Sequence, residues 1–331
     1  MKKIGALLFA SLTVLFGCGG SVKNSSEEKS VANQATTARP AFNADSAYHY
    51  IEAQVAFGPR VPESKSHEKC ATYLANSLER MGADVLIQEG EVVLFNKKRI
   101  ACKNIIGQFD KSNPNRIVLF SHWDSRPFAD MERDEALRMK PIDGASDGAS
   151  GVGVLMEIAR LYGKSKASIG IDIVFLDVED YGQPHFVKSE YQENSWCLGA
   201  QFWANNLNKS NYMPRYGILL DMVGAKDALF YKEGYSMQYA PQVVEKVWQT
   251  AASLGYGSRF VYDMGGTITD DHVYVNSIAG IPTIDIIQYD PSSSTSFGTY
   301  WHTHQDNMSI IDKGTLTAVG ETLLEIIYTE K

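Results

Sequence analysis

Several signatures of common protein classes are missing from this 331-residue sequence. It contains no Gly-x-x-x-x-Gly-Lys-Ser/Thr phosphate-binding loop, no Gly-x-Gly-x-x-Gly dinucleotide fingerprint and no Cys-x-x-Cys pair. Basic residues are in deficit, since 31 Lys and Arg face 39 Asp and Glu and leave a formal net charge of -8. Because a nucleic-acid-binding protein needs positive charge for the phosphate backbone, we exclude nucleic acid as the main partner. Small-molecule or peptide ligands remain.

The apolar run at the N-terminus is too short to cross a bilayer. Residues 4–16 are mostly apolar and follow two lysines, whereas a spanning helix needs about 20 residues. This pattern predicts an export signal at residues 1–17. The run closes in Leu15-Phe16-Gly17-Cys18, which resembles a bacterial lipoprotein signal and implies cleavage before Cys18 and acylation of its thiol. An ordinary cleaved signal peptide is the alternative.

The lipoprotein resemblance implies an exported protein that is anchored to a membrane through Cys18 and faces the periplasm. Residues 18–43 are rich in Ser, Asn, Thr, Glu and Lys, which predicts a flexible tether, and residues 44–331 are expected to form a single α/β domain. With Cys18 assigned to lipid, the remaining cysteines are Cys70, Cys102 and Cys197. An odd number excludes complete internal pairing and leaves one disulfide possible.

The apolar pattern of residues 44–331 predicts alternating helices and strands. Apolar residues at helical spacing predict helices at 46–57, 70–81, 152–162, 198–207, 243–254 and 316–327. Apolar and β-branched runs predict strands at 85–87, 92–95, 102–109, 117–120, 171–178, 216–220 and 281–287. The nearly continuous apolar run at 171–178 is typical of a parallel strand that is covered on both faces. We therefore expect a mixed, largely parallel central sheet flanked by helices on both faces.

Polar side chains follow the ends of the predicted strands. Such residues come after four of the strands and just before one helix, and they are Glu179, Asp180, His122, Asp124, Asp221, His302 and, before the helix, Asp147. Since open α/β sheets bind ligands at the carboxyl ends of their strands, we expect these side chains to meet at one edge of the sheet. For Asp147 a helix N-cap is the alternative, because Asp favours that position for its hydrogen bonding alone.

A concentration of carboxylates at one edge would repel itself unless a cation neutralised it. A bound divalent metal is therefore the economical explanation. Imidazole and carboxylate ligands without a thiolate are typical of Zn²⁺ in an open, catalytic site.

From about Ala44 to the C-terminus the chain resembles the M28 zinc peptidase superfamily, which includes bacterial two-zinc aminopeptidases and the animal-type glutaminyl-peptide cyclotransferases, or glutaminyl cyclases. The resemblance rests on an ordered set of motifs: His122-Trp123-Asp124, Asp147 in its Gly/Ala/Ser-rich turn, Glu179-Asp180, Leu220-Asp221 and Trp301-His302-Thr303. Three features resemble the cyclase branch: residues 220–225, Asp270-Asp271-His272, and Trp301 directly before His302.

The cyclase resemblance implies a single zinc held by Asp147, Asp180 and His302, and a substrate with an N-terminal glutamine. It also implies that Glu179 is the general acid and base, assisted by Asp221 and Asp270. Many relatives have Glu-Glu where this chain has Glu179-Asp180, so the shorter Asp180 must reach the metal from a shifted position. The resemblance implies an aromatic and apolar substrate pocket that includes Trp301, Phe297 and Ile268. We add Trp196, from the loop after Asp180, as a candidate without a match in the family. Core packing is the alternative for all four residues.

Two other functions fit the same residues. In a two-zinc aminopeptidase, Asp147 would bridge two metals, His122 and Asp221 would bind the second zinc, and Asp124 would lie beside it. A non-catalytic binding module on this fold would have lost ligands, whereas this chain keeps the whole set.

Overall fold

The structure is a computed structural model that describes residues 39–207 and 212–331. The predicted signal at residues 1–17 and the predicted lipidation site Cys18 lie outside the described residues. At the end of the predicted tether, Arg39 Nε lies 2.8 Å from Glu325 Oε2, and the backbone N–H of Phe42 donates to Glu321 Oε1 at 2.8 Å. Over the described ranges, no helix combines the length and the apolar character that crossing a membrane requires.

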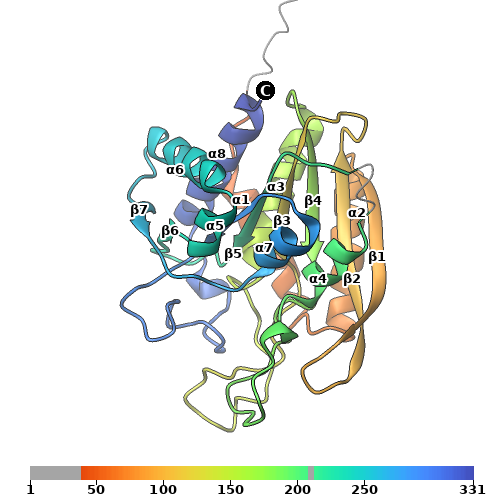
Figure 1. Ribbon diagram of the computed structural model, residues 1–331, viewed down its shortest axis with the longest axis vertical. Helices are drawn as coiled ribbons and strands as arrows, with labels where there is room; N and C mark the ends of the chain where they lie inside the picture. Colours follow the sequence, from red (N-terminus) through yellow and green to blue (C-terminus); the bar gives the residue numbers. More distant parts are fainter. Residues whose placement is uncertain (1–38, 208–211) are drawn as a thin grey trace, which may run out of the picture. The chain divides into compact units, whose positions relative to one another are not determined.

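A six-stranded mixed sheet forms the centre of the fold (Figure 1). Its spatial order is β1-β2-β4-β3-β5-β8. The strands are β1 (Asp84–Val93), β2 (Arg99–Phe109), β3 (Arg116–His122), β4 (Gly170–Leu176), β5 (Gly217–Asp221) and β8 (Thr283–Ile287). Strands β4, β3, β5 and β8 are mutually parallel. Strand β2 pairs in an antiparallel manner with both of its neighbours, β1 and β4. The predicted fold class, a mixed and largely parallel sheet, is therefore confirmed.

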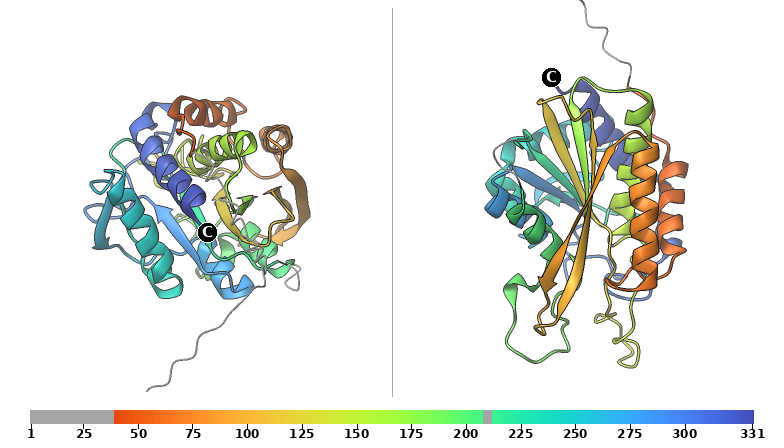
Figure 2. Two further views of the ribbon diagram at one scale, coloured as in Figure 1. Left: turned by 90° about the horizontal axis from the view of Figure 1, so that it is seen from above. Right: turned by 90° about the vertical axis from the view of Figure 1, so that its right-hand side faces the viewer.

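Helices cover both faces of the sheet, as the edge-on view in Figure 2 shows. One face packs on α2 (Lys65–Arg80), α3 (Ala149–Lys164) and α6 (Pro241–Ser253), while α8 (Lys313–Thr329) packs against α3 and α6, and α1 (Ala44–Val55) packs against α3 and α8. The other face packs on α4 (Leu198–Asn205) and α7 (Asp271–Tyr274). Alternate residues of β3 enter the two cores, with Ile117 and Leu119 in one and Val118 and Phe120 in the other. Two covered faces explain why β3 and β4 have apolar runs instead of alternation.

Several predicted boundaries were wrong. Residues 85–87 and 92–93 belong to one strand, β1, whereas residues 94 and 95 lie beyond its end. This strand lies at the edge of the sheet and is mostly exposed, so its sequence is not held to an apolar pattern. Strand β4 ends at Leu176, because Val178 adopts a left-handed backbone conformation (φ 52°). No helix was predicted between residues 255 and 315, but helix α7 begins at Asp271, with Asp270 as its N-cap.

Some short elements were not predicted at all. They are the parallel pair β6 (Phe230–Lys232) and β7 (Phe260–Met264), and helix α5 (Gly234–Tyr239). Each is at most six residues long and carries no clear apolar period. The possible disulfide is also absent, since Cys70, Cys102 and Cys197 are all buried free thiols. Stability therefore comes from the packed cores.

Candidate active site

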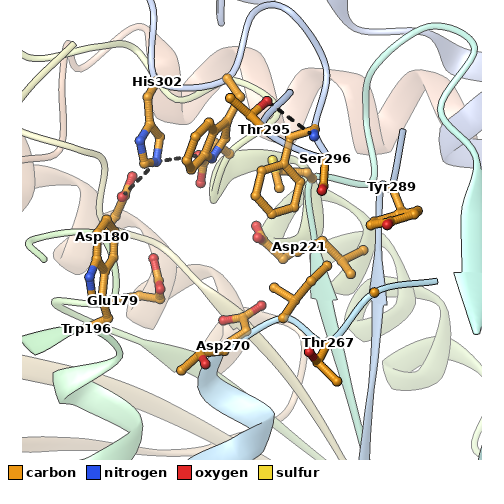
Figure 3. A pocket seen from close by; sticks show the side chains of 18 of the residues that line it. Glu179, Asp180, Trp196, Asp221, Thr267, Asp270, Tyr289, Thr295, Ser296 and His302 are labelled. Carbon is orange, nitrogen blue, oxygen red and sulfur yellow. Dashed lines mark hydrogen bonds and ion pairs between the residues drawn. The ribbon is translucent and has the colours of Figure 1, made fainter. Parts of the chain in front are cut away.

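The carboxyl ends of β3, β4, β5 and β8 meet at one edge of the sheet, beside a cavity of about 330 Å³ (Figure 3). The cavity brings together most of the predicted site residues, which come from six separate parts of the chain. Those that line it are Asp147, Glu179, Asp180, Trp196, Asp221, Ile268, Asp270, Phe297, Trp301 and His302. His122 and Asp124 lie buried directly behind it.

The predicted metal ligands Asp147, Asp180 and His302 form a compact group. Each can offer one ligand atom within 4.8 Å of the others. Nε2 of His302 lies 3.3 Å from Oδ1 of Asp180 and 3.8 Å from Oδ2 of Asp147. Oδ2 of Asp180 is buried and has no hydrogen-bond partner within the described part of the chain. A buried carboxylate oxygen without a partner is costly, so this donor set fits a bound cation.

A second group shares Asp147 with the first. Nε2 of His122 lies 3.1 Å from Oδ1 of Asp147 and 3.1 Å from Oδ1 of Asp221. Burial lowers the pKa of His122, but its contacts with Asp124, Asp147 and Asp221 more than offset this effect and raise it well above its ordinary value. In the absence of a second cation, a protonated His122 thus neutralises this pair of carboxylates. The same three residues are the second zinc site of the aminopeptidase alternative.

Asp147 is held by its backbone, and the N-cap alternative was wrong. The residue that caps α3 is Gly148, and no side chain makes a capping hydrogen bond there. Gly148 has φ 90°, and a Cβ at this position would lie 2.7 Å from the carbonyl oxygen of Asp124, so only glycine fits. The carboxylate of Asp306 accepts the backbone N–H groups of Ser146 and Asp147 at 2.7 and 3.0 Å. The Asp147 side chain is therefore free to face the cavity.

Residues 144–148 also read Gly-Ala-Ser-Asp-Gly, which matches the Gly-x-Ser-x-Gly pattern of serine hydrolases. In those enzymes the serine stands on a turn between a strand and a helix and is activated by a histidine. Ser146 is fully buried in a loop, and its hydroxyl lies 3.4 Å from the Tyr300 hydroxyl. No imidazole hydrogen-bonds to Ser146 in the residues that the structure covers. The serine match is therefore coincidental.

Glu179 lies next to the ligand group and is surrounded by negative charge. Ligand atoms of Glu179, Asp270 and Cys197 lie within 4.8 Å of one another. Burial raises the pKa of Glu179 well above its ordinary range, and the charges of Asp180, Asp270 and Asp271 add to the effect while His122 opposes it. A buried carboxyl group whose pKa is raised in this way is a stronger base than an ordinary glutamate, so it is suited to take up a proton and to pass it on.

Asp124 fixes the segment that carries Glu179 and Asp180. Its Oδ1 accepts the backbone N–H of Glu179 at 3.2 Å, and its Oδ2 accepts that of Asp180 at 3.3 Å. Both carboxylate oxygens accept from this backbone segment, so Asp124 holds Glu179 and the proposed ligand Asp180 from the side opposite the cavity.

A buried ion pair near the site was not predicted. Arg126 donates to both carboxylate oxygens of Asp130 at 2.7 and 2.8 Å, and its Nη1 donates to the Asp180 carbonyl at 2.9 Å. Burial raises the pKa of Asp130, but the hydrogen bond from Arg126 and the contact with His302 outweigh it and lower the pKa below its usual value. In the sequence, only the spacing of four positions between Arg126 and Asp130 indicated a possible ion pair, and this spacing is also common between exposed charged residues.

The predicted pocket residues are all half-buried and line the cavity. Trp301 stacks on His302 with ring centroids 3.7 Å apart, and Phe297 packs on Trp301 at 4.8 Å. Trp196 lies parallel to His302 at 6.1 Å and also packs against the core below α4. Contact with a substrate stays a prediction for these residues and for Ile268.

The fold and the site together define an α/β protein of the zinc exopeptidase type. The chain belongs to peptidase family M28, whose model matches residues 104–327. It is 54% identical to a Zn-dependent exopeptidase from Parabacteroides distasonis, over 88% of this chain and 100% of that one, with a TM-score of 0.87. It is 55% identical to Tannerella forsythia glutaminyl cyclase over the same shares, also with a TM-score of 0.87. The glutaminyl-peptide cyclotransferase of Drosophila melanogaster is 22% identical over 280 residues, which is 78% of this chain and 73% of that protein.

Proposed function

We propose that this protein is a zinc-dependent glutaminyl-peptide cyclotransferase, which converts an N-terminal glutamine to pyroglutamate and releases ammonia. The observation that carries the proposal is the pair of Glu179 and Asp270 beside the Asp147, Asp180 and His302 group. The similarity to Tannerella forsythia glutaminyl cyclase along that protein's entire length supports it.

Asp147, Asp180 and His302 would hold one zinc, and a zinc there would act as a Lewis acid on the side-chain amide oxygen of the substrate. In an enzyme with a single zinc, the imidazole of His122 would instead lie between Asp147 and Asp221, 3.1 Å from a carboxylate oxygen of each.

Glu179 would carry the proton transfer. The α-amine of the N-terminal glutamine attacks the Cδ carbon of the same residue, so a new C–N bond forms and the bond from Cδ to the amide nitrogen breaks. Glu179 takes one proton from the attacking amine and delivers it to the departing nitrogen, which leaves as ammonia. Because the nucleophile belongs to the substrate itself, no activated water is needed. Asp270 and Asp221 keep Glu179 in the right protonation state and orient the leaving nitrogen.

The pocket walls would select and orient the glutaminyl residue. Trp301 and Phe297 form one apolar wall and Ile268 lines the same cavity, while Trp196 lies near Glu179 and Asp180 (Figure 3). These surfaces would exclude water from the amide and hold the side chain bent back toward the amine.

The alternative is a two-zinc exopeptidase of the same family. The shared position of Asp147 in both ligand groups favours it, and so does the name of the Parabacteroides distasonis relative. An assay on a Gln-initiated peptide separates the two functions. A cyclotransferase releases ammonia and leaves the first peptide bond intact, whereas release of the free N-terminal amino acid would overturn the proposal.

We also propose that the enzyme works outside the cytoplasm as a lipoprotein that is anchored to a membrane through Cys18. The N-terminal pattern of residues 1–18 supports this location. Its substrates would then be peptides or proteins that expose an N-terminal glutamine in the periplasm.

A further inference from the structure

Two of the three proposed zinc ligands are connected by a buried ion pair outside the cavity. The pair is Arg126 and Asp130, and both side chains have no solvent exposure. Arg126 Nε donates to Asp130 Oδ1 at 2.7 Å, and Nη2 donates to Oδ2 at 2.8 Å. A forked contact of this kind fixes the planes of both groups.

Asp130 contacts the His302 ligand on its far side. Oδ1 of Asp130 lies 3.2 Å from Nδ1 of His302, while Nε2 faces the proposed metal position. The backbone N–H of Met131 donates to the carbonyl of His302 at 3.2 Å. The loop that carries Asp130 and Met131 therefore contacts both the ring and the backbone of His302. This support matters because His302 has φ 54°, a left-handed conformation that residues other than glycine rarely adopt.

Arg126 contacts the Asp180 ligand. Its Nη1 donates to the carbonyl oxygen of Asp180 at 2.9 Å and to Oδ1 at 3.2 Å. The other carboxylate oxygen, Oδ2, is left without a partner. The guanidinium also lies over the Trp196 ring, 4.5 Å from its centroid. One arginine therefore orients a metal ligand and a wall of the pocket.

We propose that Asp130 and Arg126 are positioning residues, which preset His302 and Asp180 for zinc before the metal arrives. The negative charge of Asp130, 3.2 Å from Nδ1 of His302, favours the ring proton on Nδ1 and leaves the Nε2 lone pair for the metal, although the two groups are not aligned as a hydrogen bond within the described residues. Arg126 occupies Oδ1 of Asp180 and leaves Oδ2. The inference rests on the zinc site of the proposed function. Partners of this kind typically contribute 10–100-fold to metal affinity.

The choice of variant follows from the charges. Asp130→Asn removes the negative charge beside His302 and replaces one of the two oxygens that accept from Arg126 with an NH2 group. It also leaves the positive charge of Arg126 uncompensated near the metal, so both effects weaken zinc binding. A neutral residue in place of Arg126 would have two opposing effects on zinc affinity. Asp180 would lose the contacts that orient it, but the electrostatic potential at the metal position would become more negative. Arg126→Lys avoids this conflict, since it keeps the charge and loses the fork.

The chain supplies a matched control. Arg116 and Asp172 form a second buried forked pair, with distances of 2.5 and 2.9 Å, near the amino ends of β3 and β4. Asp172→Asn therefore breaks an equivalent pair at the opposite end of the same strands. It is expected to lower stability while leaving the zinc site unchanged.

Zinc affinity is measured on the full-length protein by competition with a chelating dye, and the visible spectrum of the Co²⁺-loaded protein reports the ligand geometry. We expect Asp130→Asn to weaken zinc binding about 10–100-fold and to change the Co²⁺ spectrum, with Asp172→Asn within about threefold of wild type. Equal zinc affinity in Asp130→Asn and wild type overturns this inference alone. If Asp130→Asn does not fold, Arg126→Lys decides: weaker zinc binding supports the inference, and unchanged binding overturns it. A wild type that binds no zinc overturns the proposed function as well.

Discussion

The thiol of Cys197 lies 3.3 Å from Oε1 of Glu179. Cys197 is fully buried, and burial raises the pKa of its thiol well above the ordinary value, with nearby carboxylates adding to the effect. The group is therefore a neutral S–H that donates to the carboxylate. The backbone N–H of Cys197 also donates to the carbonyl of Glu179 at 3.0 Å. The start of α4 thus orients the proposed general base.

Replacing Cys197 with Ala is expected to lower kcat about fivefold, because one hydrogen bond is worth about 1 kcal/mol. KM and zinc content should change little. Cys197→Ser should recover most of the rate, since its hydroxyl can also donate. Cys70→Ala removes a buried thiol in α2, away from the cavity, and serves as the control. Equal losses in the Ala and Ser variants would show that the role of Cys197 is packing.

Glu179→Gln separates catalysis from metal binding. The amide keeps the shape of the side chain but cannot take a proton, so kcat should fall by about 10²–10⁴ while KM changes little. Zinc content, measured by atomic absorption, should equal that of wild type. A variant as active as wild type would exclude Glu179 as the general base.

Asp180→Ala and His302→Ala are expected to remove the metal. Each deletes one of three proposed ligands in a group that spans less than 4.8 Å, and the wild type should carry one zinc per chain. Metal analysis of the purified variants checks both points. Two equivalents of zinc in the fully active wild type, unchanged by either substitution, would instead support the exopeptidase.

The stability of the zinc-free protein should fall as pH rises. Burial raises the pKa of Asp221 and of Asp306 to about 7, and the charge of Asp147 adds to both shifts. Carboxyls in an unfolded chain titrate near pH 4, so the stability that these groups contribute is fully present below about pH 4 and is lost as pH rises through about 7.

Thermal unfolding of chelator-treated protein tests this pH dependence, and Tm should be lower at about pH 8 than at about pH 5. Added zinc should raise Tm more at the higher pH, because it binds the deprotonated ligands. A zinc-free protein that is more stable at about pH 8 contradicts the assignment of these shifts.

Cys18 lies outside the described residues, so its lipidation remains a prediction from residues 15–18. Wild-type protein should partition into the detergent phase after extraction. Cys18→Ser should release the protein or leave its precursor unprocessed. Wild-type protein in the aqueous phase would refute the lipid anchor.

The sequence alone was sufficient to find β3 and β4 and the polar residues that follow them. Both strands are covered on two faces, so each of their positions is buried and the apolar run stands out. Parallel strands deliver their carboxyl ends to one edge, which is why His122, Glu179 and Asp221 could be expected to meet. The edge strand β1 was misjudged because most of its residues face solvent.

Only the tertiary structure decided how the site is held. Arg126 and Asp130 lie in a polar loop, and no local pattern distinguishes a buried ion pair from an exposed one. Asp306 supports Asp147 from 159 positions away, and Cys197 supports Glu179 from beyond an intervening loop, 18 positions away. Short-range periodicity reports which face of a helix or strand is buried, whereas the partners of a buried polar group are set by long-range packing, which brings together residues more than 100 positions apart.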